Sequence, residues 1–323
     1  MAKHSSKCKE YKRRILIGLD LATFKQKQKK QQNQAIAICI SLVFLLGGAF
    51  YGYNQIFSGD EDLLVSRNDE NNCPVDGPSA YTAIVIDQSE GFPKNQVQQI
   101  RTMFGAWLAG RTEDILESSL DQDPSQFNRR AFDSNAMIQL YVMSKDALNT
   151  DDGLKPVLSI CRGPLPANVD SAQSIFVNTK LLDKKLKELV EKMDDELLKL
   201  LVEHEQETSP IIETITALSA SDFAVDMDKP HYLIMVSDMV QYGGKGKYSQ
   251  FPKYGNFTLD YDEWKQNHQN TFGSLRGVEW QVIYLNRADD PDFEGAQTRK
   301  HQNFWNEFFR KSLYAGEGRF IVR

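Results

Sequence analysis

The chain has 323 residues, a net charge of −6, four cysteines and five histidines. No histidine is paired with another histidine or with a cysteine at the spacing of metal ligands, so a zinc site is unsupported. Only Cys73 and Cys161 lie beyond residue 54. Two cysteines exclude a disulfide-dense scaffold, and they leave open either one bridge or two unpaired thiols.

The charge is divided unevenly along the chain. Residues 1–34 contain ten Lys/Arg and two acidic residues, a net +8, so residues 54–323 carry −14 because the segment between them is neutral. Polybasic segments bind anionic lipid or nucleic acid. This basic arm lies next to an apolar segment and has few aromatic residues, which favours a topology signal in contact with lipid. The acidic remainder argues against nucleic acid as a partner.

Residues 35–53, AIAICISLVFLLGGAFYGY, contain no charge. A bilayer core of about 30 Å needs about 20 apolar residues at helical rise, so this run predicts one transmembrane helix. The basic flank of a span stays in the cytoplasm. We therefore expect a single-pass protein of the cytoplasmic (inner) membrane, with its C-terminal domain outside, which is the periplasm in a Gram-negative cell. The long basic region is unlike a signal peptide, although Ala49 and Gly52 leave cleavage as an alternative.

The rest of the chain predicts a linker, residues 54–78, and one domain, residues 79–323. Apolar, β-branched runs predict strands at 81–86, 136–143, 157–160, 231–236, 278–285 and 320–322. Apolar residues at helical spacing predict helices at 94–108, 178–205, 210–218 and 298–314. This alternation is typical of an α/β domain with a doubly wound, mostly parallel sheet. The Gly- and Tyr-rich stretch 241–256 is interpreted as a long loop.

Two predicted strands end in acids, and ligands of doubly wound folds bind at the carboxyl ends of the strands. The first strand ends at Asp87, followed by Ser89, and the later one ends in Ser237-Asp238. A helix between them begins near Ser209. Carboxylates and hydroxyls at one sheet edge form an oxygen-only site, which Mg²⁺ or Ca²⁺ prefers. Taken singly, each acid is also explained as the start of a turn, and Ser209 as a helix N-cap.

The order of these elements resembles a von Willebrand factor A domain. That family carries a metal-ion-dependent adhesion site built from an Asp-x-Ser-x-Ser turn, a Thr before a Pro-Leu helix start and an Asp of a Ser-Asp-Gly strand end. Asp87 and Ser89 match the start of the turn, whereas Gly91 stands where the family has its second Ser. Ser209 matches the Thr, with Thr208 as the alternative, and Asp238 matches the later Asp.

The resemblance covers residues 79–323 and implies a metal site of Asp87, Ser89, Ser209 and Asp238. Met239 replaces the glycine of the family's strand end. The resemblance also implies a protein partner at the strand-end face, bound through a divalent cation. The sequence shows no recognisable catalytic triad, so no enzymatic activity is expected. Two alternatives remain: a membrane-anchored, metal-dependent hydrolase of phosphorylated or envelope substrates, and a structural subunit of an envelope machine with an inactive metal site.

Overall fold

The computed structural model describes residues 71–89, 91–111, 124–149, 153–164, 179–202, 208–224, 228–242, 258–268, 272–287 and 297–322. All of them belong to one compact unit, Leu64–Arg323. The predicted basic arm and transmembrane helix lie outside these residues, as do most of the predicted linker and most of the stretch 241–256. Within the described ranges, no helix has the length and apolar character needed to cross a bilayer.

One six-stranded sheet forms the centre of this unit, in the order β3-β2-β1-β4-β5-β6. The strands are β1 (Tyr81–Asp87), β2 (Met137–Met143), β3 (Leu158–Cys161), β4 (His231–Ser237), β5 (Val278–Tyr284) and β6 (Gly318–Val322). All neighbours are parallel except the edge strand β3, which is antiparallel to β2. The predicted α/β class with a mostly parallel sheet is thus confirmed for the described domain. The strand order reverses between β1 and β4, which is where doubly wound folds bind ligands.

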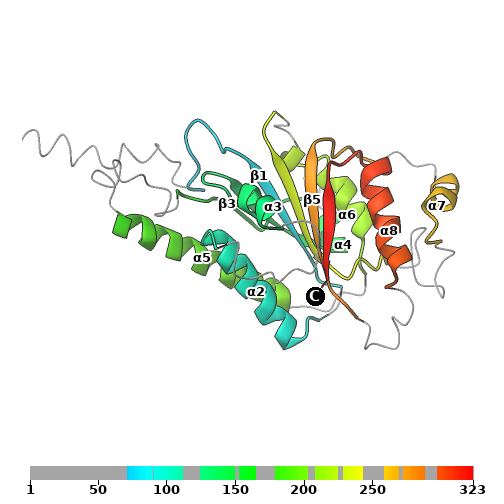
Figure 1. Cartoon of the computed structure of the whole chain (residues 1–323), viewed down its shortest axis with the longest axis horizontal. Coiled ribbons are helices and arrows are strands. Elements are labelled where there is room, and N and C mark those ends of the chain that lie inside the picture. The colour runs from blue at the N-terminus through cyan, green and yellow to red at the C-terminus, as the bar shows by residue number, and fades with distance from the viewer. Residues whose placement is uncertain are drawn as a thin grey trace, which may run out of the picture. The chain divides into compact units, whose positions relative to one another are not determined.

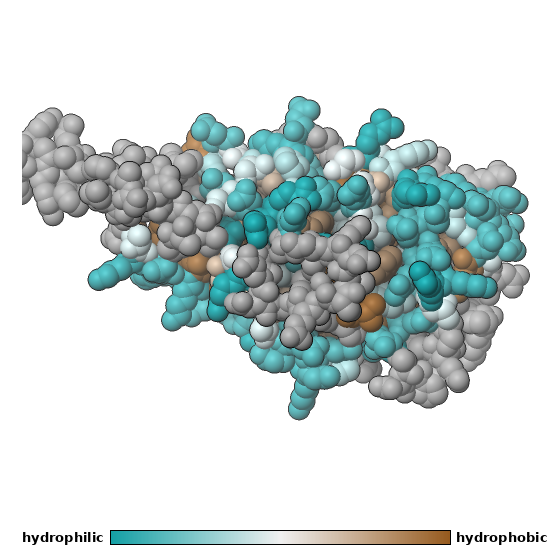
Figure 2. Space-filling view, in the orientation of Figure 1, coloured by the Kyte–Doolittle hydropathy of each residue, from teal (hydrophilic) through white to brown (hydrophobic). Residues whose placement is uncertain are grey.

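Helices cover both faces of the sheet (Figure 1). One face carries α2 (Lys94–Leu108), α3 (Pro124–Ala131) and α5 (Thr179–Val202), and the other carries α6 (Ile211–Leu218), α7 (Tyr261–Asn267) and α8 (Arg299–Glu307). The short helix α4 (Lys145–Leu148) follows β2. A π-helical turn, Phe308–Ser312, continues α8. The outer surface in Figure 2 is mainly hydrophilic among the described residues, with small separate apolar patches.

The two cores follow from the alternation of side chains along each strand. In β1, Ile84 and Ile86 pack towards α2 and α5, whereas Ala83 and Val85 pack towards α6 and α8. Both sets are buried. A strand that is apolar at every position is stable only when both faces are covered, which is why β1 lies in the middle of the sheet.

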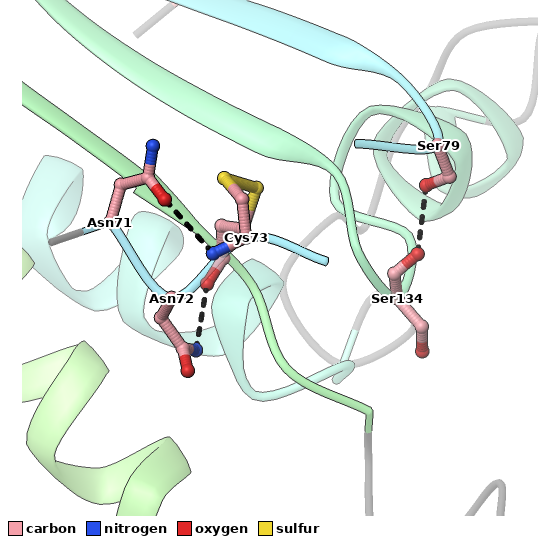
Figure 3. The surroundings of a disulfide bond; sticks show 6 residues. Asn71, Asn72, Cys73, Ser79 and Ser134 are labelled. Atoms are coloured by element: carbon pink, nitrogen blue, oxygen red, sulfur yellow. Dashed lines mark hydrogen bonds between the residues drawn. A yellow bond between two sulfur atoms is a disulfide. The ribbon is translucent and has the colours of Figure 1, made fainter. Parts of the chain in front are cut away.

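A disulfide joins Cys73 to Cys161 with a Cα–Cα distance of 4.7 Å (Figure 3). Backbone contacts reinforce this connection, because the Cys161 N–H donates to the Asn71 carbonyl (2.7 Å). The Asn72 side-chain amide donates to the Cys161 carbonyl (3.2 Å). Residues 71–73 are therefore fixed against the edge strand β3, and the folded domain begins before the first predicted strand.

The start of α6 is capped by a residue that is distant in the sequence. Pro210 occupies the N-cap position and provides no side-chain acceptor. The Ile212 N–H instead donates to Oε1 of Gln241 (2.8 Å), and the Gln241 amide donates to Glu213 (2.9 Å). The fully buried Gln241 thus fixes the first turn of α6 to the segment after β4.

Replacing Gln241 with Met, which has a similar shape but lacks the amide, is expected to reduce the free energy of unfolding by about 2 kcal/mol. The buried Ile212 N–H would lose its acceptor, and no water can reach it. Urea unfolding measures the loss. Gln98→Met, on the exposed side of α2, is the matched control and should change stability by less than about 0.5 kcal/mol. Equal effects of the two variants would contradict the capping role.

Candidate functional site

A carboxylate and two hydroxyls meet at the carboxyl edge of the sheet. Asp87 ends β1, Ser237 ends β4, and Ser209 lies just before α6. Oδ2 of Asp87 accepts hydrogen bonds from Ser209 Oγ (2.9 Å) and from Ser237 Oγ (2.7 Å). The three side chains are 4%, 2% and 0% exposed, so this Asp87 cluster is almost fully removed from solvent.

Strand register brings Asp87 and Ser237 together. Ile86 of β1 is paired with Val236 of β4, so the next residue of each strand lies at the same depth and on the same face. That face is the one covered by α6 and α8. The sequence pattern predicted Asp238 as the neighbour of Asp87, but the alternation of side chains brings the preceding residue, Ser237, to the carboxylate.

A two-residue bridge positions Ser209. Its N–H donates to the Tyr242 carbonyl (2.7 Å) and its carbonyl accepts from the Tyr242 N–H (2.8 Å). The segment before α6 is thereby paired with the segment after β4. Ser209 does not act as an N-cap, because its hydroxyl donates to Asp87 instead.

Turn geometry explains a second group of contacts at the same edge. The Ser89 N–H donates to Oδ1 of Asp87 (3.0 Å), and the Val240 N–H donates to Oδ1 of Asp238 (2.8 Å). Both are the two-residue side-chain turns that Asp favours after a strand. These turns account for one oxygen of each carboxylate. They do not account for Oδ2 of Asp87, which serves two hydroxyls from other parts of the chain.

Asp238 is 3% exposed and has a different neighbour from Asp87. Its Oδ2 lies 3.5 Å from Nε of Arg287, which follows β5. The backbone carbonyl of Asp238 accepts from the side-chain amide of Gln297 (3.0 Å). The contacts therefore join one carboxylate to hydroxyls and the other to a guanidinium. No sequence pattern indicates Arg287, because its role depends on a contact between two separate strand ends.

The oxygens of the Asp87 cluster are of the kind that a hard divalent cation prefers. They are numerous enough to fill part of its coordination shell. One carboxylate and two neutral hydroxyls supply three ligands, and Mg²⁺ takes six, usually including several waters. Each hydroxyl oxygen keeps at least one lone pair while it donates its proton, although Ser237 Oγ also accepts from the Met239 N–H (2.8 Å). Among the residues that the structure describes, no group of three or more His, Cys, Asp or Glu side chains is gathered as a metal site. A cation here would therefore depend on Asp87 and its two serines.

A buried polar network supports the turn after β4. Met239 has a φ of 60°, in the left-handed region where the resembling family has glycine. Its carbonyl accepts from the indole N–H of Trp305 (2.8 Å), which also approaches Nε2 of His301 (3.2 Å). Nδ1 of His301 lies 2.7 Å from the hydroxyl of Tyr284.

Acid is expected to destabilise the domain through His301, because burial lowers the pKa of its imidazole to about 4. The unfolded chain, with an ordinary pKa of 6.5, then binds more protons between pH 6.5 and about 4, so stability falls as the pH falls through that window. By pH 5 the loss amounts to about 2 kcal/mol. Urea unfolding at pH 7.5 and pH 5 should show this loss in the wild type and not in His301→Gln. Parallel losses in both proteins would assign the effect to other groups.

The strand order and the Asp87 cluster define a doubly wound α/β domain with a carboxylate–hydroxyl group at its switch point. No protein-family model and no curated protein sequence matches the chain. Among solved structures, the pilus adhesin SpaC from Lactobacillus rhamnosus GG, in an open conformation, aligns over 77% of this chain and 28% of its own, with a TM-score of 0.37 and 13% identity. The human COPII-coat protein Sec24c aligns over 80% of this chain and 31% of its own, with a TM-score of 0.33 and 10% identity. The chain thus spans less than a third of either protein, and likenesses at this level carry no inference about function.

Proposed function

We propose that this chain is a membrane-tethered protein-binding module that presents a von Willebrand factor A-like domain outside the cytoplasmic membrane. The tether is the apolar segment 35–53, and the basic arm before it stays inside. The Cys73–Cys161 disulfide supports the outer location, because such bonds persist in oxidising compartments and are rare in the cytosol.

The strand-end face around the Asp87 cluster is the proposed binding face. One observation carries this assignment: Asp87 gathers Ser209 and Ser237 at the topological switch point of the sheet. Mg²⁺ or Ca²⁺ would be held by these three side chains, with Ser89 beside them in the turn after β1. A cation held by neutral hydroxyls and a single carboxylate keeps a net positive charge, which attracts a carboxylate of the partner.

The proposal assigns no catalysis to this site. Both oxygens of Asp87 already accept hydrogen bonds, and the side chain is 4% exposed. A nucleophile or general base needs a free oxygen within reach of its substrate. As the contacts stand, Asp87 could serve a hydrolase, or hold a cation, only after some of these hydrogen bonds are exchanged.

A structural subunit without a working metal site is the second candidate, and one observation favours it. The hydroxyls of Ser209 and Ser237 satisfy Asp87, and Arg287 faces Asp238, so both of these buried carboxylates already have partners. In that case the partner would bind the same face without a cation.

Site-specific photo-crosslinking of the full chain in native membranes tests the proposal. A photoreactive residue at position 89, on the strand-end face, should capture a specific protein, and EDTA should abolish the capture. Position 134, which precedes β2 at the opposite edge and is similarly half-buried, is the control and should capture nothing specific. Capture at position 89 that survives EDTA supports the structural candidate. Equal capture at both positions would contradict the proposed binding face.

A further inference from the structure

Arg287 and Asp238 are held close together by a third residue. Oε1 of Gln297 accepts from the Arg287 N–H (2.6 Å), and its amide donates to the carbonyls of Leu285 (2.7 Å) and Asp238 (3.0 Å). The strand ends of β4 and β5 are therefore connected through one side chain. Gln297 thus fixes the backbone from which the Arg287 side chain extends to Asp238.

The Arg287–Asp238 pair is buried enough that solvent screens its charges only weakly. The side chains of Arg287 and Asp238 are 12% and 3% exposed, with 3.5 Å between Nε and Oδ2. A buried carboxylate is costly unless a positive charge lies beside it. The guanidinium supplies that charge where the resembling family would have only a cation.

The carboxylate that Arg287 neutralises belongs to the residue next to a member of the Asp87 cluster in the chain. Asp238 directly follows Ser237, whose hydroxyl donates to Asp87. The carboxylates of Asp87 and Asp238 together with the Arg287 guanidinium carry a net charge of −1. Without Arg287, the two carboxylates would carry −2. The affinity of an oxygen site for a divalent cation rises with the negative charge of its surroundings.

We propose that Arg287 is an internal counter-cation that keeps the affinity of the strand-end face for divalent cations low. The guanidinium neutralises Asp238, so a cation at Asp87 meets one net negative charge. A carboxylate from the partner supplies the second negative charge. The cation and the partner therefore bind together rather than one after the other. This inference rests on the proposed cation-dependent function and names its regulation.

Mn²⁺ binding to the purified full chain in lipid nanodiscs, followed by the electron paramagnetic resonance signal of free Mn²⁺, tests the inference. Arg287→Gln should bind Mn²⁺ about tenfold more tightly than the wild type, because one opposing charge is gone. Arg310→Gln removes an exposed arginine that is paired with Glu307, and should match the wild type. If Arg287→Gln binds no more tightly than a wild type that does bind, the inference is overturned and the proposed function stands. If neither binds, both fall.

A second pair of variants covers the case in which Arg287→Gln fails to fold. Asp238→Asn leaves the guanidinium without its counter-charge and should bind Mn²⁺ about tenfold more weakly than the wild type. The double variant Asp238→Asn/Arg287→Gln is neutral at this pair, as the native pair is, and should return to the wild-type affinity. A double variant that stays as weak as Asp238→Asn would make Asp238 a direct ligand and would overturn the counter-cation role.

Discussion

Removing the Cys73–Cys161 disulfide is expected to lower the free energy of unfolding of the domain by about 4 kcal/mol. The two cysteines are 88 residues apart, so the bond restricts a large part of the unfolded chain. Both side chains are buried, and the hydrogen bonds of Asn71 and Asn72 to Cys161 depend on the same contact. For a domain of this size the loss corresponds to a fall in Tm of about 10 °C.

Urea and thermal unfolding of Cys73→Ala/Cys161→Ala measure this effect. Cys8→Ala, in the predicted cytoplasmic arm, is the control and should leave the unfolding of the domain unchanged. Reducing agent should destabilise the wild type and have no effect on the double variant. A double variant as stable as the wild type would show that residues 71–73 are not held against β3 through this bond.

Asp87→Ala is expected to cost about 3 kcal/mol of stability, because two buried hydroxyls lose their acceptor and the Ser89 N–H loses its turn contact. The carboxylate lies between β1, β4 and the start of α6, where solvent cannot replace it. The same substitution should abolish any stabilisation by Mg²⁺ or Ca²⁺. Chemical denaturation with and without the cation measures both effects together.

Asp87→Asn separates the structural role from the charge. An amide oxygen still accepts from Ser209 and Ser237, so the loss of stability should stay near 1 kcal/mol. The negative charge is gone, so the response to divalent cations should disappear as completely as in Asp87→Ala. A response that persists in Asp87→Asn would place the cation elsewhere.

Long, regular elements were predictable because their patterns are strong. The helix 94–108 was predicted at the bounds that the structure shows, since its buried residues repeat at helical spacing. The strands of the sheet centre were predicted within one residue, because they are apolar on both faces. The short helices α3 and α7 were missed, since each is seven or eight residues long and mostly polar. Tyr261 and Trp264 are the buried residues of α7, too few to define a period.

Only one feature of the candidate site was predictable from the sequence: residues that follow parallel strands lie at the same edge of the sheet. That rule brought Asp87 and Ser209 into one hypothesis, and the structure places them in contact. It could not distinguish Ser237 from Asp238 as the neighbour of Asp87, because the choice depends on the register of β1 and β4. The contact between Arg287 and Asp238 was out of reach for the same reason, since it joins segments about 50 residues apart through tertiary packing.

Calorimetric titration of the full chain in nanodiscs with Mg²⁺ and Ca²⁺ tests most directly whether Asp87 holds a divalent cation at the strand-end face. The wild type should show one weak binding site per chain, and Asp87→Asn should show none. Asp262→Asn, which removes an exposed acid of α7, should bind as the wild type does. Equal binding heat in the wild type and Asp87→Asn, or no heat in the wild type at millimolar cation, would contradict a cation site at Asp87.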